Sequence, residues 1–511
     1  MSAVDAVRAL YPAWVPFVAP ALSAAMGWVC GRTLVGAALW WLADARMETT
    51  PWPERAAYGY EARAGGLWVT VTVSAAVSVV TAAYFSGPLS GLGFGQTLGL
   101  TLAASVVGAS GPLRRVSVRA LGRDPGRRER WRSAASRWIA LMGHIVAMLV
   151  LAAFAPAEAG APLLGFVAAG ALTAVAWNFG MGARLGRLLG LLGPAPPAVQ
   201  ALVHREAERA GVAVRGIWRM SSVVANAFAL PMAKELAFTD PILDLLDEDE
   251  LTAVTAHELG HLAEPASVRY GRMFVSMALL PLVAARWLIA QVGPIGFLVV
   301  LLVINAVLIL ARRTWRRMEE RADHAAHGAD VHDGAAYGRA LEVIYRYNGM
   351  PATMPDRRAT HPDLWDRLHA SGVTPDWPRP ETRPKWRSRL AGVLGLLGGM
   401  LVPGVLWHAL VYGTTWPQAH LLYGSEAWML AVQGDNEPDP ERALLYFDAA
   451  LELDPEDWWT AAARVETLLD LGRCVDARQS AEWLPDAPGW VDDATRQFIE
   501  DVRAEARACR Q

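Results

Sequence analysis

Long apolar runs alternate with short polar and basic segments along most of the chain. A transmembrane helix needs about 20 consecutive, mostly apolar residues. By this criterion the sequence predicts spans at roughly 14–43, 66–86, 89–110, 137–156, 162–181, 271–291, 294–311 and 390–412. The first run is long enough for one tilted helix or a broken pair. The pairs 66–86/89–110 and 271–291/294–311 have the very short turns of helical hairpins. The pattern therefore predicts a mainly α, polytopic membrane protein.

Composition and charge support a membrane protein and suggest its orientation. Mean hydropathy is +0.22, and 19% of the residues are charged, against about 25% in soluble domains. The segment 111–136 carries eight arginines and two acids, which places it in the cytoplasm by the positive-inside rule. Counting spans from there puts 182–270 and 312–389 in the cytoplasm as well. We expect an integral protein of a bacterial inner membrane that contacts the lipid bilayer. The basic residues are not interleaved with aromatic residues, so we expect no nucleic-acid partner.

The last part of the chain, residues 413–511, differs from the rest. It holds 20 acidic and 8 basic residues and reads as a series of helices. Its spacing resembles tetratricopeptide helix pairs, which usually bind protein partners; the residues that carry this likeness are Ala443, Phe447, Ala450, Leu451 and Pro455. The alternative is an ordinary helical cap without a partner. The side of the membrane on which this tail lies is left open. Cys474 and Cys509 either pair, if the tail is extracytoplasmic, or are two free thiols.

The clearest chemical motif is His257-Glu-Leu-Gly-His261. An acidic segment with a capping aspartate precedes it and predicts the start of a helix. On that helix His257 and His261 lie one turn apart, so both imidazoles leave the same face and can hold one zinc ion. Glu258 lies beside the metal and can take a proton from zinc-bound water and pass it to a leaving amine. The alternative is two surface histidines on an amphipathic helix.

A catalytic zinc site needs a third protein ligand and one open position. Glu319 and Asp323 lie four residues apart downstream and share a helix face, so Glu319 is the expected third ligand. Asp323 would then hydrogen-bond a ligating histidine and set its tautomer. Glu320 is the alternative ligand, with a solvated charge as its ordinary role. Three further histidines lie near and are expected mostly at the surface: His324, His327 and His332. Other divalent metals also suit such a site.

Four segments, taken in order, resemble one known family, the HtpX-type membrane zinc endopeptidases, which are gluzincins related to the Ste-type CAAX prenyl proteases. They are NAFALPMAKELAFTDPILDLLDEDELTAVTAHELGHL, two following spans, MEERAD and ATHPDLWDRL, within about residues 200–370. The MEERAD match assigns the ligand role to Glu319 rather than Glu320. The chain departs from the family pattern in having about five spans before the zinc helix and an acidic tail.

The resemblance also implies roles for three residues outside the zinc motif. Asn226 would lie on a strand that pairs with an extended substrate. His361 would stabilise the oxyanion as the carbonyl becomes tetrahedral, and Arg367 would brace the same region. Without the resemblance they read as a turn asparagine, a loop histidine before proline and a surface arginine.

These observations predict four regions. They are an N-terminal transmembrane region (1–181), a zinc peptidase domain (182–389), a further span (390–412) and the helical tail (413–511). The peptidase domain is expected to contain a small strand element at 214–240 and to be interrupted by a transmembrane hairpin at 271–311. The predicted function is a membrane-embedded endopeptidase with one Zn²⁺, acting on misfolded or membrane-associated polypeptides. Two alternatives stay open: a CAAX-type prenyl-protein protease, and an inactive scaffold that presents its tail to a partner.

Overall fold

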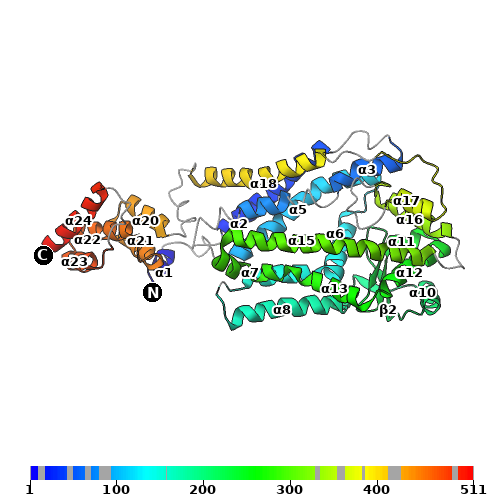
Figure 1. Ribbon diagram of the computed structural model, residues 1–511. Helices are drawn as coiled ribbons and strands as arrows, with labels where there is room; N and C mark the ends of the chain where they lie inside the picture. Colours follow the sequence, from blue (N-terminus) through cyan, green and yellow to red (C-terminus); the bar gives the residue numbers. More distant parts are fainter. Residues whose placement is uncertain are drawn as a thin grey trace. The chain divides into compact units, whose positions relative to one another are not determined.

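The structure is a computed structural model. It describes residues 2–9, 18–42, 50–63, 71–79, 94–156, 158–327, 334–353, 363–381, 386–412, 427–485 and 493–509. Two compact units divide the chain: unit 1 comprises 1–36, 68–111 and 392–511, and unit 2 comprises 37–67 and 112–391. Figure 1 labels their helices and strands.

Unit 2 contains a four-stranded sheet in the order β1-β2-β4-β3. The strands are β1 (Leu192–Pro194), β2 (Gly216–Met220), β3 (Ala227–Leu230) and β4 (Glu235–Thr239). β2 and β4 are parallel, whereas β1 and β3 pair antiparallel at the two edges. The small strand element expected at 214–240 is therefore confirmed, with β1 as an addition.

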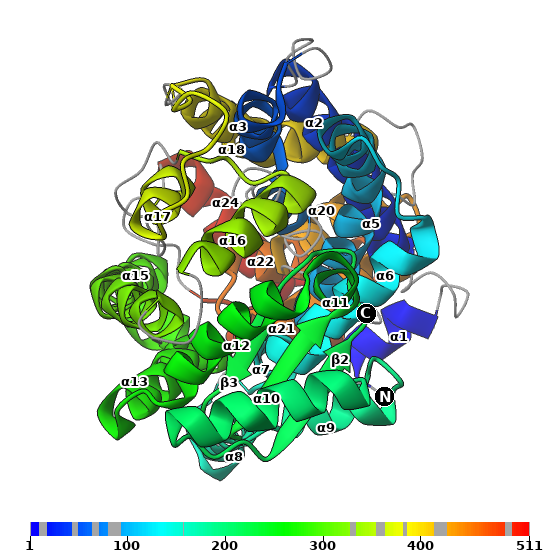
Figure 2. The ribbon, with the colours of Figure 1, turned by 90° about the vertical axis from the view of Figure 1, so that its right-hand side faces the viewer.

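One apolar core joins this sheet to helices α10 (Pro197–Ala210) and α12 (Glu248–Leu262). Its buried members come from both helices and from the strands, among them Val203, Leu236, Phe238, Val254 and Leu259. Helix α11 (Asp240–Leu245) leads from β4 toward α12. Figure 2 shows α12 beside β3 and α16 (Gly334–Asn348), with α15 (Ala285–His327) next to them. The core thus holds α12 against the edge of the sheet.

Helix α12 begins where the acidic segment predicts. The Asp247 side chain accepts a hydrogen bond from the backbone N–H of Glu250, and the Glu250 carboxylate accepts one from the backbone N–H of Asp247. This reciprocal capping box satisfies two backbone donors that the first helical turn leaves without partners. Nearly all of α12 is buried.

The predicted hairpin 271–291/294–311 is wrong. Helix α15 runs without interruption from Ala285 to His327, through the Gly-Pro pair that suggested a turn. The chain instead turns earlier, after α13 (Ala266–Ser276), through the short helices η4 (Met277–Leu279) and α14 (Leu280–Val283). There Val283 is buried against α7 (Gly143–Phe154) and α8 (Ala161–Asn178). A proline is tolerated inside a long apolar helix when its surroundings satisfy the freed carbonyl.

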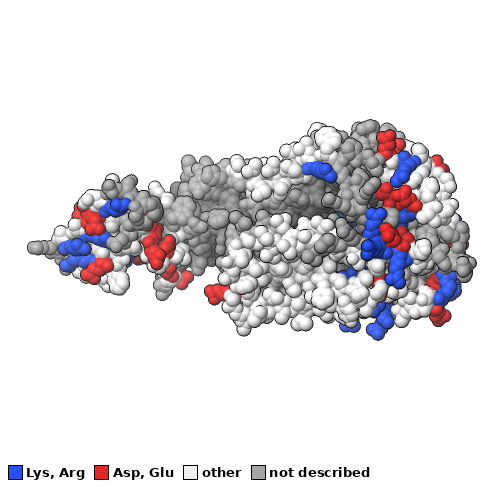
Figure 3. All heavy atoms as spheres, viewed as in Figure 1, with Lys and Arg blue, Asp and Glu red and all other residues white. Residues whose placement is uncertain are grey.

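Two described helices meet a length and composition test for membrane spans: residues 20–40 within α2 (Val18–Leu42), and α8 (Ala161–Asn178). The predicted span 137–156 is not one straight helix. A π-helical turn, η3 (Arg137–Leu141), follows α6 (Arg127–Ser136), and the chain bends by 80° before α7 (Gly143–Phe154). The bend shortens the apolar helix. In Figure 3 the surface over α7, α8 and α15 is almost free of charge, whereas charged residues gather over the end of unit 2 that holds the sheet.

The remaining helices of unit 2 connect or cover these elements. They are α3 (Trp52–Arg63), α9 (Met181–Leu188), α16 (Gly334–Asn348) and α17 (Leu364–Ala370). α16 and α17 form a second buried cluster around Tyr337, Leu364 and Leu368.

In unit 1, the apolar helix α2 packs closely against α5 (Phe94–Leu121). A Cβ on Gly31 would lie 2.1 Å from the Ser105 carbonyl oxygen, and one on Gly108 would lie 2.2 Å from that of Trp28. Glycines at these contacts allow the backbones of membrane helices to approach. Residues 71–79 are helical, and Ser78 donates a hydrogen bond to Met400 of α18 (Trp386–Tyr412). The turn predicted between 86 and 89 lies outside the described residues.

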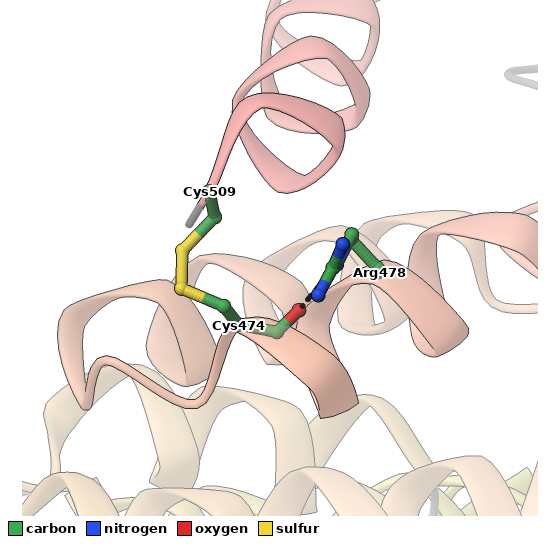
Figure 4. Close-up of a disulfide and its surroundings, with 3 residues drawn as sticks. All are labelled: Cys474, Arg478 and Cys509. Atoms are coloured by element: carbon green, nitrogen blue, oxygen red, sulfur yellow. Dashed lines mark hydrogen bonds between the residues drawn. A yellow bond between two sulfur atoms is a disulfide. The ribbon is translucent and has the colours of Figure 1, made fainter. Parts of the chain in front are cut away.

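The tail is α-helical, as predicted. It comprises α20 (Ala427–Asn436), α21 (Pro440–Leu453), α22 (Trp458–Asp470), α23 (Cys474–Glu482) and α24 (Asp493–Ala508). The N-terminal helix α1 (Ala3–Ala9) packs on α21, with Val7 buried in their shared cluster. A disulfide between Cys474 and Cys509 joins the start of α23 to the residue after α24 (Figure 4). The likeness to tetratricopeptide repeats stays a prediction.

Candidate metal centre

Three side chains converge in unit 2 as a candidate metal site. Nε2 of His257 lies 3.7 Å from Oε2 of Glu319, and Nε2 of His261 lies 3.6 Å from the same oxygen. The three ligand atoms all lie within 4.8 Å of one another. Ligands about 2.0–2.1 Å from a tetrahedral zinc ion lie about 3.4 Å apart. The arrangement therefore fits one ion bound by two imidazoles and one carboxylate.

Hydrogen bonds at the opposite ring nitrogens orient both imidazoles. Nδ1 of His257 lies 2.8 Å from the Tyr337 hydroxyl and 3.1 Å from Oδ1 of Asp323. Nδ1 of His261 lies 3.0 Å from Oε1 of Glu264. Because each Nδ1 faces an acceptor, we assign the ring hydrogen to Nδ1 in both residues. Each Nε2 would then offer its lone pair to a metal ion that displaces any proton held there.

Behind His257 lies a buried network of Asp323, Tyr337 and Arg367. The Tyr337 hydroxyl donates to Asp323 at 2.7 Å, and Arg367 Nη2 donates to Asp323 at 2.6 Å and to the Tyr337 oxygen at 2.7 Å. Burial raises the pKa of Tyr337 well above its ordinary value, so the hydroxyl keeps its hydrogen. Burial alone would raise the pKa of Asp323, but His257 and Arg367 outweigh it and hold this pKa far below its usual range. Asp323 is therefore an ionised acceptor for His257.

His261 has its own support in Glu264, which is 4% exposed and accepts a hydrogen bond from Arg272. Burial alone would lower the pKa of His261, but the neighbouring carboxylates of Glu264, Glu319 and Glu258 raise it to about 10. The centre and its supports hold four carboxylates and two guanidinium groups, the carboxylates being Glu258, Glu264, Glu319 and Asp323. A divalent cation balances this excess of negative charge.

A close helix contact brings Glu319 to the two histidines. Gly260, inside the motif, packs on Ala322 of α15, where an added Cβ would lie 3.0 Å from the Ala322 Cα atom. An alanine at position 260 would require the two helices to separate by a few tenths of an ångström, and a larger side chain would require more. The small size of Gly260 therefore favours the close approach of α15 that brings Glu319 to the histidines.

A cavity of about 400 Å³ opens over these ligands, within the range of about 300–1,000 Å³ typical of ligand sites. Glu258 lines it beside both histidines and Glu319, and β3 lines it through Ala227, Phe228 and Ala229. β3 is an edge strand of the sheet. An extended peptide can add to such an edge by backbone hydrogen bonds, so a bound chain would run past the metal site.

The structure places most of the residues predicted for the site. Asn226 lines the cavity immediately before β3, and its backbone exchanges hydrogen bonds with Thr239. Arg367, read without the resemblance as a surface residue, is 6% exposed and pairs with Asp323. Glu320 is exposed and pairs with Arg316, so Glu319 and not Glu320 faces the histidines.

The remaining predicted histidines are not part of the metal group in the described part of the chain. His324 is exposed. His361 and His332 lie outside the described residues, as does the side chain of His327. The oxyanion role of His361 therefore stays a prediction.

Sequence reasoning missed three supporting residues, Glu264, Arg272 and Tyr337. Glu264 follows His261 by three residues, just after the end of α12, so the two side chains lie on the same side. That spacing could have identified Glu264 as a partner of His261. Tyr337 is 80 residues from His257, and nothing in its local sequence marks it.

Comparison with known proteins agrees with this geometry. Residues 196–371 match the family described as Peptidase family M48. "Protease HtpX homolog" from Trichormus variabilis is 41% identical over 69 residues, which are 13% of this chain and 24% of that protein. Its counterpart from Picrophilus torridus is 45% identical over 64 residues, or 12% and 21% of the two chains. "Metalloendopeptidase OMA1, mitochondrial" from Danio rerio is 28% identical over 158 residues, or 29% and 33%.

The matched part spans about a fifth to a third of the length of these relatives. Within it, the predicted resemblance to HtpX-type peptidases is confirmed, and residues 196–371 are similar to the M48 peptidase domain. This segment contains all three candidate metal ligands.

Proposed function

We propose that this protein is a membrane-embedded zinc endopeptidase that hydrolyses peptide bonds of misfolded or membrane-associated polypeptides. The observation that carries the proposal is the convergence of His257, His261 and Glu319 on one point inside an M48-type domain. The fit to tetrahedral spacing and the excess of carboxylates support zinc or a similar divalent ion.

Zinc, when bound, supplies a Lewis acid that polarises the scissile carbonyl and lowers the pKa of water. In the proposed mechanism His257, His261 and Glu319 would hold the ion at the wall of the cavity that they line. Glu258, which lines that cavity, takes the proton from the attacking water and delivers it to the leaving amine. Asp323 and Glu264 keep the hydrogens on Nδ1 of the two histidines, so the Nε2 lone pairs stay available.

We propose that the substrate binds as an extended strand along β3. Its backbone would pair with the free edge of β3, which makes binding tolerant of sequence. The loop before β3 is held in place by three contacts that support such a preformed edge. The side-chain Oδ1 of Asn348 accepts from the backbone N–H of Ala225, the Ser133 hydroxyl accepts from the backbone N–H of Val223, and Arg123 donates to the Val223 carbonyl.

We further propose that the metal centre lies on the cytoplasmic side and the tail on the opposite side of a bacterial inner membrane. Arg123 belongs to the basic segment 111–136 and also bonds to Tyr347 of the M48-type domain, which ties this domain to the segment that the positive-inside rule assigns to the cytoplasm. The Cys474–Cys509 disulfide supports an oxidising compartment for the tail. A protease added to spheroplasts should remove the tail and leave 196–371 intact; the reverse pattern would contradict this orientation.

The function is tested with detergent-purified full-length protein and casein as an unfolded substrate. We expect cleavage that a chelator stops, that added zinc restores, and that Glu258→Gln reduces by a factor of about 10²–10⁴, the contribution of a general base. Arg205→Ala, on the exposed face of α10, is the matched control and should retain activity. Failure to cleave casein despite stoichiometric zinc would argue for a narrow substrate range, and failure to bind zinc would refute the proposal.

A further inference from the structure

A second, smaller cavity of about 120 Å³ adjoins the cavity over the metal site. We propose that it is a recognition pocket for a carboxylate side chain, Asp or Glu, of the bound polypeptide. This inference rests on the proposed function, because it assumes an extended chain along β3.

The path of β3 connects the two cavities. Ala227 to Ala229 line the larger cavity, and Leu230, Pro231 and Met232 line the smaller one. Pro231 and Arg272 line both. An extended chain advances about 3.3 Å per residue, so a peptide paired with β3 passes from one cavity to the other within a few residues.

The lining of the smaller cavity is apolar with a cationic side. Arg269 and Arg272 project from α13, and His144 lies in the first turn of α7. No acidic side chain is among the described residues that line it. Its apolar walls are formed by Ala140, Leu141, Trp177, Leu230 and Met232.

Some polar groups around this cavity already have partners, and others do not. Trp177 Nε1 donates to the Ile139 carbonyl, and Asn178 donates to Ala174 and Ser276. In contrast, the buried atoms His144 Nδ1 and Arg272 Nε have no hydrogen-bond partner among the residues that the structure describes. A buried polar group that lacks a partner destabilises the structure, because it has lost its hydrogen bonds to water. A ligand with hydrogen-bond acceptors removes that destabilisation.

Charge and size select a carboxylate. One nitrogen of Arg272 already pairs with Glu264, whereas Arg269 has no ion pair in the described part of the chain, so the pocket has about one positive charge to offer. An apolar cavity of about 150 Å³ accommodates benzene; a volume of about 120 Å³ therefore suits one side chain. Continuity with β3 favours a residue of the bound peptide over an anionic lipid headgroup.

The test measures binding to full-length Glu258→Gln protein, which should hold peptides without cutting them. A fluorescent, uncharged, extended peptide is compared with a set in which Glu replaces Gln at each position in turn. We expect Glu at one position to raise affinity about tenfold, which corresponds to about 1.4 kcal/mol, because its carboxylate would accept charged hydrogen bonds that Gln accepts only as a neutral group. Arg269→Ala should abolish this preference and His144→Ala should weaken it, whereas Arg205→Ala should leave it intact.

Equal affinities at every position, or no measurable binding of any peptide, would overturn the inference. So would an absent Glu preference combined with binding to phosphatidylglycerol nanodiscs that Arg269→Ala weakens, which would assign the pocket to lipid. Zinc-dependent casein cleavage by the wild-type protein is measured in parallel. Cleavage without a Glu preference refutes the pocket alone, whereas absence of bound zinc and of cleavage refutes the proposed function.

Discussion

The hydroxyl of Tyr337 offers a sharp test of how the metal centre is held. Tyr337→Phe removes one oxygen that contacts His257 Nδ1 at 2.8 Å, Asp323 Oδ1 at 2.7 Å and Arg367 Nη2 at 2.7 Å. Asp323 and Arg367 still contact each other at 2.6 Å after the change, so the fold should survive. The orientation of His257 should suffer most, because it loses its shorter Nδ1 contact.

The expected loss follows from these contacts. A hydrogen bond to a charged group contributes about 1.5–3 kcal/mol, and removing such a partner of a ligating histidine typically costs about 10–100-fold in metal affinity or activity. We therefore expect zinc affinity to fall by about 10–100-fold. Because Asp323 keeps its ion pair with Arg367, we expect the free energy of unfolding to fall by no more than about 1–3 kcal/mol.

The assay is a competition titration of zinc against a chromophoric chelator, with thermal unfolding as a check on the fold. Tyr347→Phe is the matched control, since Tyr347 lies on the same helix and Arg123 stacks on its ring face, an interaction that phenylalanine keeps. Wild-type zinc affinity in Tyr337→Phe would show that the network does not orient His257, and would refute the reasoning. An equal loss in the control variant would show a general effect on α16.

Three further predictions concern other parts of the chain. Gly260→Val should lower zinc affinity at least tenfold, because the valine side chain would collide with Ala322 of α15. Gly271→Val is the control in the same titration, since a Cβ at that position meets no atom within 4 Å. Equal zinc affinities of the two variants would contradict the packing argument. Cys474→Ser should destabilise the tail by about 4 kcal/mol, the loop-closure entropy expected for a disulfide between residues 35 positions apart. Limited proteolysis should then cut the tail faster, and an unchanged cleavage rate would contradict this prediction. The folded pKa of His261 is raised to about 10, so its proton stabilises chelator-treated protein below pH 6.5, and this contribution to stability is lost as pH rises toward 10. Because zinc must displace the same proton, zinc affinity should rise over the same pH range. A zinc affinity that does not change with pH in the titration would refute this.

Local pattern was enough to predict the two candidate histidine ligands and their helix. The spacing of His257 and His261 places both imidazoles on one face of any helix, and the acidic start with its aspartate predicts where that helix begins. These features depend only on helical periodicity and on backbone groups within one turn. The choice between Glu319 and Glu320 was different, because neighbouring positions on a helix point about 100° apart. It required the family resemblance, and the structure agrees by turning Glu320 to solvent.

Apolar runs predicted membrane helices but not their breaks. Hydropathy cannot distinguish a turn from a continuous helix at Gly293-Pro294, because both residues are common in membrane helices. The packing of Val283 against α7 and α8 decides that the chain turns before α15. Similarly, the bend between η3 and α7 arises in an apolar stretch that reads as one span.

The sequence by itself determined the helical class, the two histidines, the general base candidate and the region of the third ligand, because each follows from spacing within one element. Only the tertiary structure decided which side chains hydrogen-bond to the candidate ligands and orient them. Tyr337 reaches His257 across 80 residues, and Arg367 reaches Asp323 across 44. Such contacts depend on how α12, α15, α16 and α17 pack, and no local periodicity encodes the distance between side chains on different helices.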